Sequence, residues 1–206
     1  TRFGDFMDGG DDVDTVELTD GSDAFFLHDS FSGFHTSLNL TADDNGKSGT
    51  ARIANIENIK SGLGDDIVDL TSPDYSLTGQ NITVDGGSGN DTLWGSNANE
   101  TLKGGVGDDV LFGGAGTNVL TGGAGADEFQ FTGSSIDDTI TDFSLSDGDS
   151  LKFFNTGGAK FDRSSVSLNN AGDEISISDG AELLTITLEG ANLQLGDLGS
   201  DVLIIV

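Results

Sequence analysis

The chain contains no cysteine and one proline, and only 8 lysines and arginines stand against 36 aspartates and glutamates in its 206 residues. The absence of cysteine excludes disulfides, and with them zinc and redox sites built on thiols. A formal charge of -28 excludes nucleic acid as a partner, because binding it requires a basic surface. Long apolar runs are absent too, the longest being Val202–Val206, so no membrane insertion is expected.

This excess of negative charge repels itself in a compact chain. Either the chain is disordered at neutral pH, or cations neutralise it when it folds. The 13 phenylalanines and the strand patterns described below favour the second alternative. A small domain without disulfides needs another source of stability, and bound metal is the simplest. With 32 glycines and 34% hydrophobic residues, the core must be thin, which suits a repetitive coil better than a globule.

A nine-residue repeat runs from Gly86 to Gln130. Its five units are GGSGNDTLW (86–94), GSNANETLK (95–103), GGVGDDVLF (104–112), GGAGTNVLT (113–121) and GGAGADEFQ (122–130). An isolated unit, SGLGDDIVD, occupies 61–69, and a weaker one, GGDDVDTVE, occupies 9–17. Large apolar residues recur at every ninth position, at Leu93, Leu102, Leu111, Leu120 and Phe129. A flexible glycine-rich linker has no reason to keep this interval.

Each unit combines a glycine-rich turn with a short alternating strand whose large apolar residue points inward. Two units make one turn of a flattened coil, so residues i and i+18 stack and all strands are parallel. Leu93, Leu111 and Phe129 then form one inner ladder, and Leu102 and Leu120 form the other. Glycine suits the turns because it tolerates positive φ.

The rest of the chain is also expected to form β structure, with no helix. Alternating segments occur at 36–40, 165–168, 175–178 and 184–188, and turns are expected at 169–174 and 179–182. The predicted fold is all-β: a parallel β-roll split by an inserted segment at 19–60 and a loop at 71–80, with an antiparallel cap. The predicted domains are 1–60, with a degenerate repeat and the insertion, 61–131, the roll, and 132–206, the cap.

Position six of the units carries the candidate chemistry. On one side of the coil it reads Asp91, Asp109 and Asp127, and on the other Glu100 and Asn118. Carboxylates stacked about 4.7–4.9 Å apart repel each other unless a cation lies between them. Calcium fits, because it accepts six to eight oxygens with flexible geometry, whereas magnesium demands a strict octahedron and zinc prefers nitrogen or sulfur.

Two strong calcium sites are therefore predicted, at Asp91/Asp109 and at Asp109/Asp127. Asp66 is expected to join this side next to Asp91, and Asp14 is a candidate to extend it below Asp66. The side with Glu100 and Asn118 should bind more weakly, because Glu is longer by a methylene and Asn lacks the charge. Backbone carbonyls would come from the glycine turns at Gly62, Gly64, Gly87, Gly89, Gly105, Gly107, Gly123 and Gly125. For a single unit a simple turn-forming aspartate is the better explanation of the pattern, but for a row of three it is not.

The pattern GGxGxDxUx resembles the signature of RTX proteins, which are bacterial toxins, hydrolases and adhesins exported by type I secretion. The resemblance is strong in 86–130 and departs from the signature at Ser96, Ala98, Glu100 and Asn118. It implies several bound calcium ions, a secreted protein and the type I secretion machinery as a partner. The stretch 138–153 resembles the segment that caps such repeats. Within it, Asp142, Asp147 or Asp149 either holds a terminal ion or belongs to a plain turn.

The C-terminal region resembles an uncleaved type I secretion signal. After Arg163 there is no lysine or arginine but seven acidic residues, and the chain ends in an acidic residue followed by an apolar tail. A final strand of the sheet is compatible with this reading. Because the chain starts at Thr1 and not at methionine, it is expected to be a fragment, so the sequence gives no prediction for an N-terminal signal peptide.

No enzyme is expected. The sequence lacks HExxH and GxSxG, and His28 and His35 lie in no motif.

The resemblance points to the C-terminal region of a large adhesin, in the group that includes bacterial ice-binding adhesins. The protein is expected to be a monomer that is secreted to the surface of a Gram-negative cell. The alternatives are the tail of an RTX hydrolase or toxin and a module that binds glycan or ice. Positions three and five lack the Thr and Asn ladder expected for ice binding. Trp94 and Phe112 point outward, either under another segment or as a binding patch.

Overall fold

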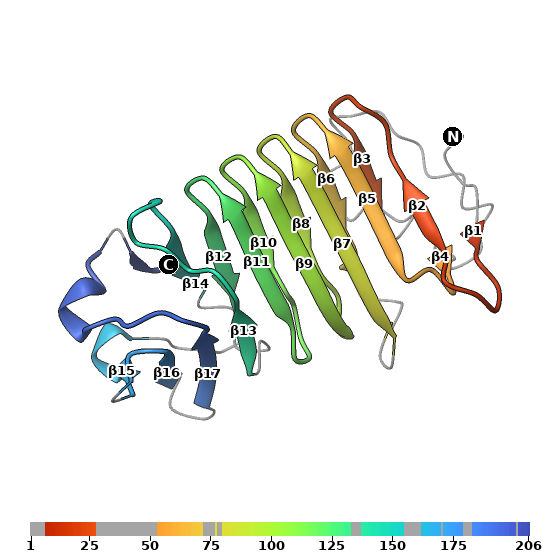
Figure 1. Cartoon of the computed structure of the whole chain (residues 1–206). Helices are drawn as coiled ribbons and strands as arrows, with labels where there is room; N and C mark the ends of the chain where they lie inside the picture. The colour runs from red at the N-terminus through yellow and green to blue at the C-terminus, as the bar shows by residue number, and fades with distance from the viewer. Residues whose placement is uncertain are drawn as a thin grey trace.

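The computed structural model describes residues 7–27, 53–71, 77, 80–132, 137–154, 162–169, 171–178, 183–200 and 202–206. The predicted strand at 36–40, the turn at 179–182, most of the loop at 71–80 and both histidines lie outside these residues. Two sheets of mostly parallel strands run the length of the molecule (Figure 1), and a two-stranded pair, β1–β4, lies at the N-terminal end. The predicted all-β roll is thus confirmed.

The nine-stranded sheet has the order β15-β16-β17-β13-β11-β9-β7-β5-β2. The seven-stranded sheet has the order β18-β14-β12-β10-β8-β6-β3. The strands are β1 (Met7–Asp8), β2 (Thr15–Glu17), β3 (Ala24–Phe26), β4 (Ile53–Ala54), β5 (Asn58–Leu63), β6 (Ile67–Asp69), β7 (Asn81–Ser88), β8 (Thr92–Trp94), β9 (Asn99–Val106), β10 (Val110–Phe112), β11 (Val119–Ala124), β12 (Glu128–Phe131), β13 (Asp138–Ile140), β14 (Ser150–Phe153), β15 (Ser167–Leu168), β16 (Glu174–Ser178), β17 (Leu183–Leu188) and β18 (Leu203–Ile205).

The core is a pair of apolar ladders that face each other between the sheets. In the seven-stranded sheet, Leu93 pairs with Leu111 and Leu111 with Phe129, all fully buried. Leu102 and Leu120 are paired and buried in the same way in the other sheet. The burial of these side chains is the main source of hydrophobic stabilisation in each turn. The predicted i, i+18 stacking is therefore confirmed.

The parallel coil extends beyond the repeat block on both sides. At its N-terminal end, β2 pairs with β5 and β3 with β6, so both ends of the predicted insertion at 19–60 belong to the coil. At the other end β13 and β14 continue it. The separation between stacked turns is 18 residues inside the repeats but 43 and 25 residues before them and 20 and 22 after them. The register of the sheets is therefore kept although the length of chain between stacked turns varies.

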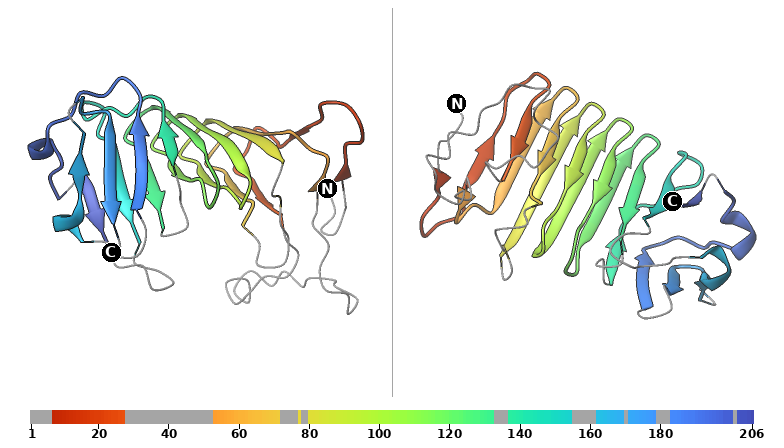
Figure 2. Two further views of the ribbon diagram at one scale, coloured as in Figure 1. Left: turned by 90° about the horizontal axis from the view of Figure 1, so that it is seen from below. Right: turned by 180° about the vertical axis from the view of Figure 1, so that it is seen from behind.

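The C-terminal region combines the predicted antiparallel strands with one further parallel strand. Strand β16 pairs antiparallel with β15 and β17, which confirms the antiparallel cap, and β17 continues the nine-stranded sheet by pairing with β13. The apolar tail forms β18, which pairs parallel with β14 (Figure 2). The only helices in the described parts are the short 3-10 turns η2 (Arg163–Ser165) and η3 (Leu195–Asp197). Neither is long and apolar enough to cross a membrane.

Glycines at positions two and four of the units let successive turns approach closely. Gly107 has φ of 134°, and a Cβ there would lie 2.0 Å from the carbonyl oxygen of Gly89 in the neighbouring turn. We expect Gly107→Ala to lower the free energy of unfolding by roughly 2 kcal/mol or more, since it combines backbone strain with a steric clash. Gly196→Ala, which adds a methyl group in open space, is the control. Equal thermal unfolding of both variants in calcium would contradict this account.

Arg163, in η2, binds the segment that leads into the last strand. Its guanidinium donates hydrogen bonds to the carbonyl oxygens of Leu198, Gly199 and Leu203. We expect Arg163→Ala to destabilise β18 by about 1–2 kcal/mol, because partly buried carbonyls lose charged donors. Amide exchange at Leu203–Ile205 should accelerate while exchange in β10 stays unchanged. Unaltered exchange in β18 would show that the strand is held by its pairing with β14 alone.

Candidate metal centre

A row of aspartates runs along the turns that lead into the seven-stranded sheet. Each residue of this Asp91 row precedes an inward apolar residue by two positions, and the backbone N–H of every member except the last donates to Oδ1 of the next aspartate. The N···O distances along the row lie between 2.6 and 3.0 Å. Its members, in order, are Asp23, Asp66, Asp91, Asp109, Asp127 and Asp149.

One oxygen of each central carboxylate in the Asp91 row has no hydrogen-bond partner. Oδ2 of Asp66, Asp91, Asp109 and Asp127 is buried and unpaired, and each of these residues is 1% exposed. A buried, unpaired carboxylate oxygen is costly unless a cation binds it. At the two ends of the row the corresponding oxygens are satisfied, since Asp23 accepts from Thr19 and Asp149 from the backbone of Ser144. The free oxygens are thus confined to the interior of the row.

The first glycine of each unit opens a small space that oxygen atoms line. A Cβ built on Gly104 would lie 2.2 Å from Oδ2 of Asp109 and 2.6 Å from the carbonyl oxygen of Gly122. The same pair of neighbours, at 2.5 and 2.6 Å, surrounds Gly86, from Asp91 and Gly104. Any side chain here would fill this space. A carboxylate and a carbonyl from stacked turns therefore face one cradle, which suits an oxygen-binding cation.

Burial raises the pKa values of these carboxyl groups in the absence of a cation. Desolvation raises the pKa of Asp109 to about 7, and those of Asp91 and Asp127 to about 6. Backbone hydrogen bonds oppose the shift, and neighbouring carboxylates add to it. The roll can therefore bury this row only if protons or cations neutralise it.

A second row lies in the turns that lead into the nine-stranded sheet. By strand register its positions are Asp14, Glu57, Ile82, Glu100, Asn118 and Asp138. Oδ2 of Asp14, Oε2 of Glu100 and Oδ2 of Asp138 are buried without partners. Buried Ile82 has no polar atom to offer, so this Glu100 row is interrupted. Desolvation raises the pKa of Asp138 to about 7 and also raises that of Glu100.

Asp14 does not extend the row below Asp66, and the prediction that it might is wrong. Asp14 pairs with Glu57 on the Glu100 row, where its N–H donates to the Glu57 carboxylate at 2.9 Å. Asp23 takes the place next to Asp66. The reason is that each unit forms only half a turn, so the weak unit at 9–17 and the unit at 61–69 lie on opposite sides of the coil. Asp14 still has a free Oδ2, which lies beside Gly9 and the carbonyl of Asn55.

Asn118 offers no free side-chain oxygen. Its Oδ1 accepts from the N–H of Glu100 at 2.9 Å, and its amide nitrogen donates to Oδ1 of Asp138 at 3.0 Å. The amide nitrogen lies next to Gly113, where the other units place the free carboxylate oxygen. In the preceding turn, the Ser96 hydroxyl donates a hydrogen bond to Oε1 of Glu100, so Oε2 of Glu100 is left without a partner. The departures from the repeat signature thus reduce the number of free oxygens in the Glu100 row.

Sequence reasoning missed Asp23 and Asp138 as members of the two rows. Asp149 was one of three candidates for a terminal ion, and it joins the Asp91 row, whereas Asp147 is exposed and Asp142 accepts from the N–H groups of Gly122 and Gly123. Asp138 was not considered. Its signal in the sequence is an aspartate two positions before a buried apolar residue, Ile140, at a spacing of 20 residues that the nine-residue search does not detect.

The donors available fit calcium. In the described residues no three acidic or histidine side chains converge on one point, so an ion would bind carboxylates from stacked turns together with backbone carbonyls. All of these donors are oxygens. The glycines at positions two and four have positive φ, among them Gly62, Gly64, Gly87, Gly89, Gly105, Gly107, Gly123 and Gly125. Calcium accepts such mixed oxygen sets with flexible geometry.

Comparison with known proteins gives the same assignment for the repeat block. Residues 83–99 and 94–129 match a family described as RTX calcium-binding nonapeptide repeat (4 copies). No curated protein matches the chain. Similar solved structures include the AlgE6R2 and AlgE6R3 subunits of the Azotobacter vinelandii mannuronan C5-epimerase. AlgE6R2 is 26% identical to this chain, with a TM-score of 0.35, and the match covers 68% of this chain and 88% of AlgE6R2. AlgE6R3 is 27% identical, with a TM-score of 0.27, and the match covers 68% of this chain and 78% of AlgE6R3. The chain therefore contains RTX calcium-binding nonapeptide repeats, folded as a parallel β-roll.

Proposed function

We propose that this chain is a calcium-dependent folding and export module of a secreted bacterial adhesin. The rows of position-six carboxylates bind several calcium ions outside the cell, and the C-terminal region carries a type I secretion signal. The module itself is non-catalytic and monomeric, and the parent protein acts at the surface of a Gram-negative cell.

The observation that supports this proposal is the set of buried carboxylate oxygens without partners. A chain with a charge of -28 gains nothing by aligning aspartates in its interior unless cations neutralise them. Asp66, Asp91, Asp109 and Asp127 would hold ions on one side, together with carbonyls of the glycine turns. Glu100, Asp138 and Asp14 would contribute on the other.

The difference in free calcium concentration between the inside and the outside of the cell would make folding depend on where the chain is. Inside the cell free calcium is scarce, so repulsion keeps the chain unfolded and able to pass through a narrow exporter. Outside, calcium at about 10⁻⁴–10⁻³ M matches the affinity of extracellular modules. Because the sites exist only in the folded roll, the free energy of binding becomes free energy of folding. The folded roll would then hinder return through the channel.

A calcium titration followed by circular dichroism tests the folding step. The metal-free chain at neutral pH should give a coil spectrum, calcium should convert it to a β spectrum, and a chelator should reverse the change. Magnesium at the same concentration is the control and should produce little conversion. An unchanged β spectrum after complete removal of metal would refute calcium-driven folding.

The export signal is proposed on the composition of the C-terminal region, which has seven acidic and no basic residues after Arg163. Residues 132–206 fused to a passenger should be exported by a type I system, and removal of the apolar tail Val202–Val206 should abolish export. Retention of the intact fusion inside the cell would contradict the signal.

The adhesin assignment rests on the few repeats and the long flanking β segments. It predicts that cells lacking the parent protein attach less well to surfaces. Attachment equal to that of the parent strain would argue instead for the tail of a hydrolase or toxin.

A further inference from the structure

An aromatic groove lies on the outer face of the seven-stranded sheet, away from both carboxylate rows. Its volume is about 250 Å³, and it is lined by Thr71, Trp94, Phe112, Gln130, Thr132 and Phe154. Trp94, Phe112 and Gln130 stand side by side on β8, β10 and β12 at paired positions. Trp94 is 37% exposed, which is unusual for so large an apolar side chain.

The hollow has a local cause in the sequence. Two positions after Trp94 and Phe112 come Ser96 and Gly114, whereas the equivalent positions in flanking turns carry the larger Thr71, Thr132 and Phe154. The Ser96 hydroxyl is bound to Glu100, and Gly114 has no side chain and φ of 90°. The two rings are therefore left uncovered by the residues that follow them, while threonines and a phenylalanine wall the ends.

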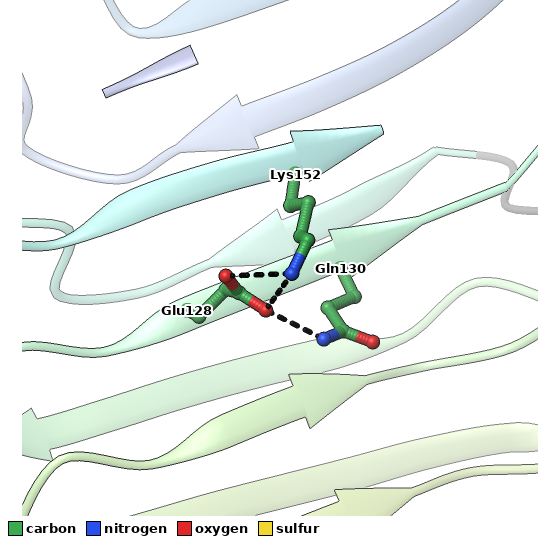
Figure 3. A network of polar contacts seen from close by, with 3 residues as sticks. All are labelled: Glu128, Gln130 and Lys152. Carbon is green, nitrogen blue, oxygen red and sulfur yellow. Dashed lines mark hydrogen bonds and ion pairs between the residues drawn. The ribbon is translucent and has the colours of Figure 1, made fainter. Parts of the chain in front are cut away.

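One end of the groove is ordered by a polar network. Lys152 contacts both carboxylate oxygens of Glu128 at 3.0 and 3.1 Å, and Glu128 accepts from the Gln130 amide nitrogen at 2.6 Å (Figure 3). The Lys152 ammonium also lies 5.4 Å from the centre of the Phe154 ring. Gln130 thus has a fixed orientation, with its amide oxygen directed away from Glu128.

We propose that this groove binds an uncharged polysaccharide chain. The faces of Trp94 and Phe112 provide stacking surfaces for sugar rings, spaced by the distance between strands, about 4.7–4.9 Å, which is close to the length of one hexose in an extended chain. Gln130 and Thr71 provide hydrogen-bonding groups beside the rings. This pairing of an apolar platform with a few polar groups is typical of small-molecule sites.

Charge determines the class of polysaccharide. Lys152, which neighbours Gln130 and Phe154 at one end of the groove, is already neutralised by Glu128, and the whole chain carries a charge of -28. A polyanionic glycan would be repelled, because none of the described residues that line the groove is a cation. The ligand expected is therefore a neutral polymer of hexose or N-acetylhexosamine.

Binding should require calcium, so this inference rests on the proposed function. Trp94, Phe112 and Gln130 each follow a member of the Asp91 row by three residues, and the platform forms only when those turns are stacked. Circular dichroism of the same samples separates the two proposals. A chain that fails to fold in calcium contradicts the proposed function, whereas a folded chain that binds no sugar contradicts only the groove.

Trp94 is the single tryptophan of the chain, so its fluorescence reports on the groove directly. In the calcium-loaded protein, acrylamide should quench Trp94, and cellohexaose, chitohexaose or mannohexaose should shift its emission saturably and protect it from quenching. Hexamannuronate, as the charged probe, should have no effect. A shielded Trp94, or a folded protein that responds to none of the three neutral probes, would overturn the proposal.

Calorimetry with variants locates the site. Trp94→Ala and Phe112→Ala should each weaken binding of the active hexasaccharide by roughly tenfold or more, as expected for an aromatic anchor. The matched control is Val119→Ala, which removes a side chain of similar exposure, 38%, from the outer face of the other sheet. Equal affinity of all three variants would place sugar binding elsewhere and contradict the groove.

Discussion

Asp109→Asn should weaken calcium binding more than any other single substitution in the roll. Asp109 lies between Asp91 and Asp127 in the row, and its free Oδ2 faces the cradle at Gly104. Asparagine keeps an oxygen that can accept from the N–H of Asp91 but replaces the free oxygen by an amide nitrogen, as Asn118 does in the other row. Two adjacent sites lose a charged ligand, so the calcium midpoint of folding should rise at least tenfold, or about 1.4 kcal/mol.

The adjacent residue provides a matched control. Asp108 is exposed at position five, and its Oδ1 accepts from the N–H of Ala126 at 2.8 Å. In the preceding turn an asparagine, Asn90, makes the same bond to Asp108. Asp108→Asn therefore removes the same charge at the same turn while keeping the structure. If both variants shift the calcium midpoint equally, general charge repulsion and not a site at Asp109 controls folding.

Acid should partly replace calcium in ordering the roll. Burial raises the pKa of Asp109 and Asp138 to about 7 and of Asp91 and Asp127 to about 6 in the folded, metal-free chain. In the unfolded chain these carboxyls titrate near 4. Between these values the folded state binds more protons, so its stability is greatest below about pH 4 and falls as pH rises through 6 to 7. Calcium affinity should change in the opposite direction, because calcium competes with protons for the same oxygens.

Thermal unfolding in chelator at about pH 5 and about pH 8 measures this effect. The metal-free chain should give a thermal unfolding transition at about pH 5 and a coil spectrum without a transition at about pH 8, and Asp109→Asn should reduce this difference because it removes one of the groups with a raised pKa. Calcium isotherms over the same range should show tighter binding toward high pH. A metal-free stability that increases with pH would mean that the rows are not buried as carboxylates.

The repeat period was sufficient to predict the register of the central turns. The interval between Leu93, Leu111 and Phe129 is constant, and a shift of the pairing by one residue would turn one of these side chains to the outer face. The antiparallel pairing of β16 with β17 followed from their alternation. The residues that form these elements lie close together in the sequence, so their pairing can be predicted without knowing the rest of the structure.

The ends of the coil could not be predicted in this way. Phe25 stacks on Val68 across 43 residues, and the turn at Asp23 keeps only Gly21 of the unit's glycines. Asp138 and Asp149 lie 20 and 22 residues beyond their row neighbours, so their membership depends on strand pairing. The sequence also does not predict the parallel pairing of β18 with β14, because a short apolar tail can pair with a neighbouring strand in a parallel or an antiparallel direction.

The orientation of side chains within the rows also required the structure. The sequence shows that Asn118 lacks a charge, but only its hydrogen bonds to Glu100 and Asp138 show that no side-chain oxygen remains free. Conversely, Ser96 departs from the signature and yet bonds to Glu100, which keeps Oε2 available. Single substitutions in the repeat therefore change the number of free oxygens in ways that the motif alone does not specify.

The most direct test of the central claim is a crystal structure of the chain grown in calcium, with anomalous difference density used to locate the ions. We expect ions between successive members of the Asp91 row, bound by Oδ2 of Asp91, Asp109 and Asp127 and by carbonyls of the glycine turns. Density absent from the spaces beside Asp109, with the carboxylates still buried in the same row, would contradict the account.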